Sequence, residues 1–155
     1  MWRYRPAHDR WSIHEIILHL ADCEAEAYVL CRQFIAEPRL VVSTHGPFRC
    51  AKALDYFHQS TKEALGLFVR LRGMTCRILR YIPDPIWTHT AQDPRKGIMT
   101  LEKWLDVETH HITHHVEQIH QNNAEWAKRT GRTGHASRQR LNALSYGSRV
   151  YGLNP

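Results

Sequence analysis

The chain has 155 residues, of which 43% are hydrophobic and 23% charged, with a formal net charge of +6. This is the composition of one globular domain with a buried core, and no apolar run approaches the roughly 18 residues of a membrane helix, so a membrane protein is excluded. Much of the positive excess follows residue 127 without an aromatic-interleaved basic face or a base-reading motif, which favours a solvated tail over a nucleic-acid-binding surface.

The first predicted helix runs from the Ser12-Ile13-His14-Glu15 capping box to about Ala36, before Pro38. Its apolar stripe comprises Ile13, Ile16, Ile17, Leu20, Ala27, Cys31, Phe34 and Ile35. His19 lies on the shoulder of this stripe and Glu24 near its middle. A carboxylate at the centre of a buried face is unusual, so Glu24 is either paired inside the protein or marks a cleft.

A loop over residues 37–49, with a turn at His45-Gly46-Pro47, leads to a second helical segment from about Cys50 to Ile82. This segment has a drifting apolar stripe and no cluster of metal-ligating residues, so we expect it to serve packing. Pro83 ends it. The connection over residues 86–99 predicts a short extended piece at Trp87–Thr90 and a turn at 93–97.

The third predicted helix spans Thr100 to Asn122, with Thr100 as its N-cap, and carries five of the twelve histidines. Its apolar stripe comprises Leu101, Trp104, Leu105, Ile112, Val116 and Ile119. His111 and His115 lie in or at the edge of the stripe, one turn apart, and Glu108 lies within it. The other histidines of the helix, His110, His114 and His120, are expected to face solvent.

Polar side chains on an apolar face need partners, because burying one unpaired costs about 1–3 kcal/mol. A metal ion would satisfy His111 and His115 together, with Glu108 as an orienting partner. The alternative is a pair of core histidines that hydrogen-bond to backbone or carboxylate groups. His19 on the first helix would complete a three-histidine site between facing helices, and its open fourth position is the geometry of a catalytic centre, where a water is acidified or a thiolate held.

Three long helical segments without a strand-rich region predict an all-α fold, an up-and-down bundle with one long connection. Four cysteines without a CxxC pair (Cys23, Cys31, Cys50 and Cys76) predict reduced thiols in a cytoplasmic protein.

Two segments resemble the paired motifs of the DinB-like superfamily. The first is Trp11-Ser12-Ile13-His14-Glu15-Ile16 running into His19-Leu20-Ala21-Asp22-Cys23-Glu24, and the second is Thr100–Leu105 leading into His111–Ile119. The resemblance implies a four-helix bundle that holds a divalent metal, often zinc or nickel, at the positions of His19, His111 and His115. It also implies relatives that act with low-molecular-weight thiols, as S-transferases or as a thiol-dependent isomerase.

The chain departs from the family pattern at both ends. Members carry a helix before the Trp-Ser motif that this chain does not supply, and the tail from Arg129 matches nothing in the family. We therefore expect a helical domain over residues 1–128 and a basic tail over 129–155. We also expect a homodimer in which the neighbouring chain closes the bundle against the first helix.

The leading functional hypothesis is a metal-dependent thiol S-transferase or hydrolase acting on a small molecule. His19, His111 and His115 would be ligands, while Glu24 or Glu108 would orient them or move protons. The alternative is a non-catalytic metal-binding or stress-response bundle that acts as an interaction module. A nucleic-acid binder has the least support from the motifs.

Overall fold

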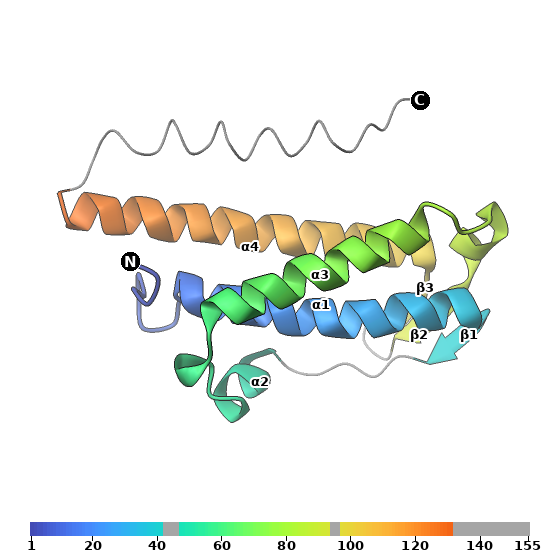
Figure 1. The fold of residues 1–155 in the computed structure, drawn as a ribbon, viewed down its shortest axis with the longest axis horizontal. Helices are drawn as coiled ribbons and strands as arrows, with labels where there is room; N and C mark the ends of the chain where they lie inside the picture. The colour runs from blue at the N-terminus through green and yellow to red at the C-terminus, as the bar shows by residue number, and fades with distance from the viewer. Residues whose placement is uncertain (42–46, 94–96, 132–155) are drawn as a thin grey trace.

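The computed structural model describes residues 1–41, 47–93 and 97–131, and it is mostly helical (Figure 1). Its helices are α1 (Ile13–Ala36), α2 (Pro47–Ala53), α3 (Thr61–Leu79) and α4 (Leu101–Arg129). The predicted all-α four-helix architecture is confirmed. Within these ranges, no helix is both long and apolar enough to cross a membrane. The predicted turns at 45–46 and 94–96, and the tail beyond Gly131, lie outside the described residues.

The helix α1 is the central element, since it packs against both α3 and α4. It begins at the predicted capping box: the Glu15 amide donates to Ser12 Oγ (3.3 Å), and the Ser12 amide donates to the Glu15 carboxylate (3.0 Å). Arg5 pairs with the same carboxylate. All ten residues from Ser12 to Ala21 are buried, polar ones included. The first half of α1 is therefore enclosed on every side.

The single helix predicted over residues 50–82 is wrong, because the chain breaks between α2 and α3. Asp55 adopts a left-handed conformation (φ 48°), and a 3₁₀ turn follows at Tyr56–His58. A new N-cap then begins α3, where Ser60 Oγ accepts from the Glu63 amide (3.3 Å). The break lets the buried Tyr56 donate its hydroxyl to Asp22 on α1.

A small sheet, which the sequence did not predict, closes the end of the bundle where α1 finishes and α4 starts (Figure 1). Strand β1 (Arg39–Val41) pairs in parallel with β2 (Thr90–Asp93), which pairs antiparallel with β3 (Gly97–Thr100). Residues 84–88, including Trp87, form a 3₁₀ turn, so the extended segment begins later than predicted. The sheet leads directly into Thr100, the predicted N-cap of α4, whose hydroxyl accepts from the Lys103 amide (3.2 Å).

Glu24 is paired inside the protein. Its side chain is 1% exposed and forms an ion pair with Arg72 of α3, whose side chain is 24% exposed. Burial raises the pKa of Glu24, and this effect outweighs that of the Arg72 guanidinium, which lowers the pKa. Since the carboxylate lies between α1 and α3, its position supports the structural interpretation of this residue over the catalytic one.

This ion pair predicts a strong coupling between Glu24 and Arg72. We expect Arg72→Met to lower the free energy of unfolding by about 3 kcal/mol, because it leaves a buried carboxylate without its counter-charge. The double variant Glu24→Gln/Arg72→Met should recover most of that loss. Urea denaturation measures both, with the exposed Arg70→Met on the same helix as control. Additive losses in the double variant would contradict the coupling.

Candidate metal centre

The contact between α1 and α4 brings together three histidines that line one cavity. His19 comes from α1, whereas His111 and His115 lie one turn apart on α4. The Nε2 atom of His111 is 3.2 Å from Nε2 of His19 and 3.0 Å from Nε2 of His115. The His19 and His115 ring centroids are 4.8 Å apart. The three predicted residues therefore converge.

These separations match the donor set of a tetrahedral divalent ion. With metal–nitrogen bonds of about 2.0–2.1 Å, two nitrogens of a tetrahedral site lie about 3.3 Å apart. The observed distances of 3.2 and 3.0 Å are close to that value. The residues present thus fit a metal ion such as zinc.

The tautomer of His115 also fits a metal ligand. Its Nδ1 lies 2.8 Å from Gln118 Oε1, and an amide oxygen only accepts, so Nδ1 carries the hydrogen. The amide nitrogen of Gln118 lies 2.9 Å from Nε2 of His114, which accepts from it. Neutral His115 therefore presents an unprotonated Nε2 to His111, with its other nitrogen held by an outer hydrogen bond, as ligating histidines are.

The local electrostatics keep the rings in the form that binds metal. Burial, together with the neighbouring His115 and His111, lowers the pKa of His19 to about 4. Burial also lowers the pKa of His115, and this effect outweighs that of the hydrogen bond to Gln118, which raises the pKa. At neutral pH His19 and His115 are therefore uncharged, and no proton has to leave either before an ion binds.

The other residues predicted for the site differ in whether they line the cavity. Glu108 is half-buried and lines the cavity beside the histidines, whereas Glu24 is not among the lining residues. The other three histidines on α4, His110, His114 and His120, are exposed, as predicted.

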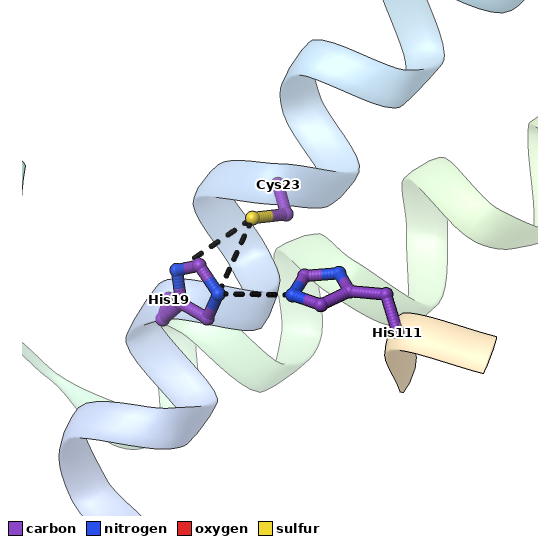
Figure 2. Close-up of side chains that lie close together, drawn as sticks. All are labelled: His19, Cys23 and His111. Carbon is purple, nitrogen blue, oxygen red and sulfur yellow. Dashed lines mark hydrogen bonds between the residues drawn. The ribbon is translucent and has the colours of Figure 1, made fainter. Parts of the chain in front are cut away.

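Sequence reasoning missed Cys23, which lies one turn after His19 on α1 (Figure 2). Its Sγ is 3.6 Å from both ring nitrogens of His19, and the ligand atoms of His19, Cys23 and His111 all lie within 4.8 Å of one another. Burial and nearby carboxylates, Glu108 first among them, raise the pKa of Cys23 to about 12. The spacing of four residues from His19 was the signal that could have found it.

Trp11 covers the histidines from the segment before α1. Its ring centroid is 4.9 Å from that of His19 and 6.3 Å from that of His115, on which it stacks. Asn122 on α4 is 2% exposed and donates to the Trp11 carbonyl (2.8 Å), while its own carbonyl accepts from Arg10 (3.1 Å). These bonds fix the indole against the site.

The cavity has a volume of about 1190 Å³ and lies along α1 and α4. Its lining includes His19, His111 and Glu108 together with apolar residues such as Trp104 and Val107. A space of this kind is suited to a small molecule with an apolar part.

Comparison with known proteins gives relatives of one type. The chain is 26% identical over 109 residues to a protein of Oceanobacillus iheyensis named as a putative metal-dependent hydrolase, covering 70% of this chain and 63% of the relative. It is 24% identical over 110 residues to the Bacillus subtilis protein YfiT, which carries the same description, covering 70% and 62%. The chain thus spans under two thirds of these relatives' length.

The fold is shared with the solved structure of YfiT from Bacillus subtilis, at a TM-score of 0.74 and 21% identity over 84% of this chain and 73% of that one. That protein is described as a probable metal-dependent hydrolase with an unusual four-helix bundle topology. The family model described as the DinB superfamily matches residues 1–119, which include α1, α4 as far as Ile119 and all three histidines of the site. This confirms the resemblance drawn from the two motifs, and the chain belongs to the DinB superfamily.

Proposed function

We propose that the protein is a metal-dependent hydrolase of a small molecule, with a divalent ion held by His19, His111 and His115. The observation that supports the proposal is that Nε2 of His111 lies between Nε2 of His19 and Nε2 of His115, at separations of 3.2 and 3.0 Å that are typical of a tetrahedral site. The two relatives are both named as putative metal-dependent hydrolases, and these names support the same reaction class. Imidazole donors suit zinc and nickel, which are therefore the metals we propose.

Each neighbouring residue has a part in this proposal. A divalent ion in such a site supplies Lewis acidity toward water or a thiol. Gln118 holds His115 in the ligating tautomer, and Trp11 limits the access of bulk water to His19 and His115. Glu108 lines the same cavity, and we assign to it the acceptance and return of the proton during the reaction.

Transfer of a low-molecular-weight thiol is the second reaction that the same centre would support, because a thiol and water are alternative nucleophiles at one ion. A non-catalytic metal-binding module would share the metal but show no turnover.

All four cysteines, each in the described part of the chain, are free thiols, which supports a reducing compartment such as the cytoplasm.

Variants on α4 test the function. In zinc-loaded protein, we expect His111→Ala to lose both metal and turnover of a panel of esters, amides and lactones, assayed with and without added thiol. Glu108→Gln should keep the metal but lose about 100-fold in kcat, because it removes the proton acceptor. The exposed His120→Ala and Glu117→Gln are the matched controls. Metal retained by His111→Ala would contradict the ligand set, and full turnover of Glu108→Gln would contradict its role.

The pKa of His19 predicts how the metal-free protein responds to acid. The unfolded chain takes up a proton near pH 6.5, but the folded chain does so only near pH 4, since its pKa is lowered to about 4. The free energy of unfolding should therefore fall by about 3 kcal/mol from this group as the pH drops from 6.5 to 4. Urea denaturation after chelation, compared with His19→Gln, measures it. An identical pH dependence in the variant would contradict the assignment.

We also propose a homodimer, in which the second chain packs against α1. Val29, Leu30 and Val107 line the open cavity along α1 and α4, and Val29 is 53% exposed. Contiguous apolar surface of this kind marks an interaction site. We expect light scattering at micromolar concentration to give twice the chain mass, and Val29→Glu to give a monomer. A wild-type monomer would contradict the proposal.

A further inference from the structure

Cys23 lies where a fourth ligand to the proposed ion would be. It is half-buried on α1, one turn after His19, and it lines the cavity with the histidines. Figure 2 shows its sulfur beside the His19 ring, with contacts to both ring nitrogens, and the His111 ring approaching His19 from α4. Two helices therefore bring a sulfur together with imidazole nitrogens of His19 and His111, and His115 lies beside His111.

The distances place the thiol within reach of an ion that the histidines would hold. In a tetrahedral site with a metal–sulfur bond of about 2.3 Å and metal–nitrogen bonds of about 2.0–2.1 Å, a sulfur and a nitrogen lie about 3.6 Å apart. The Sγ of Cys23 is 3.6 Å from both ring nitrogens of His19, so it lies beside that ring, and the ligand atoms of His19, Cys23 and His111 all lie within 4.8 Å of one another. The three groups are therefore close enough to share one ion.

We propose that Cys23 is the fourth protein ligand of the metal centre, which would then hold its ion through one thiolate and three imidazoles. The inference rests on the three-histidine centre of the proposed function. When the ion binds, the sulfur–hydrogen bond of Cys23 breaks, its proton passes to solvent, and the remaining electron pair forms the sulfur–metal bond. No oxidation or reduction takes place.

This ligand changes what the centre can do at rest. Catalytic zinc sites keep one position open for water, whereas sites with four protein ligands are closed. With Cys23 bound, a substrate or nucleophile has to displace the thiolate or enter as a fifth ligand. Replacing Cys23 leaves three imidazoles and an open position, so Cys23 would control access to the ion.

Cobalt(II) substitution of the full chain tests the inference, because a cobalt–thiolate bond gives a charge-transfer band in the near ultraviolet and tetrahedral cobalt absorbs in the visible. We expect wild-type protein to show both. Cys23→Ser and Cys23→Ala should lose the ultraviolet band, keep visible absorption, and bind cobalt about ten-fold more weakly. The matched control is Cys50→Ser, a second half-buried cysteine that lines the same cavity and should keep both bands.

The outcomes separate the two proposals. Two results would overturn the role of Cys23 and leave the three-histidine centre intact. In the first, wild-type protein binds cobalt without the ultraviolet band. In the second, the band survives in both Cys23 variants while circular dichroism shows that they remain folded. Wild-type protein that binds no cobalt and no zinc overturns the metal centre itself. Loss of the band in Cys50→Ser alone would assign the thiolate to that residue and overturn the inference.

Discussion

The complete burial of the first half of α1 is the constraint on which the rest of the structure depends. Ten successive residues, from Ser12 to Ala21, lie inside the protein, although a single helix face needs to bury only part of them. Polar groups in such a segment must find partners within the fold. Ser12 and Glu15 satisfy each other, His14 contacts Thr61 Oγ1 (2.5 Å) and the Tyr56 carbonyl (2.7 Å), and His19 meets the histidines of α4.

The partners of these groups explain the unusual elements of the fold. The break at Asp55 places the Tyr56 carbonyl against His14 and its hydroxyl against Asp22, so α1 is held by an irregular segment as well as by helices. The N-terminal segment is tied to the far end of α4 through Arg10, which donates to Glu125 (2.8 Å) and to Asn122 (3.1 Å). Both arrangements surround the helix that carries His19, and the second positions Trp11 over it.

The candidate centre combines rigid support with neutral donors. His19, His111 and His115 come from the middle of long helices, so their separations are set by helix packing and not by loops. A cluster of rings whose burial lowers the pKa of His19 and His115 is poorly suited to holding protons and well suited to holding a cation. The shared fold with YfiT shows the architecture alone, since the two chains are 21% identical, and the function has to be argued from this site.

The sequence by itself determined α1, the start of α4 and the position of His111 and His115 on one face, because caps and a helical period are local properties that place residues i and i+4 together. The end of α4 was predicted at Asn122, but the helix continues to Arg129. The sequence did not reveal the break at Asp55, because an apolar stripe does not show which residue adopts a left-handed conformation. It also did not reveal the small sheet, because strands of three and four residues are too short to show a period. Only the tertiary structure decided that Glu24 meets Arg72 of α3, while Cys23, its neighbour, lies near His111 of α4. The physical reason is that successive helical residues point about 100° apart, and which neighbour each meets depends on how α3 and α4 pack around α1.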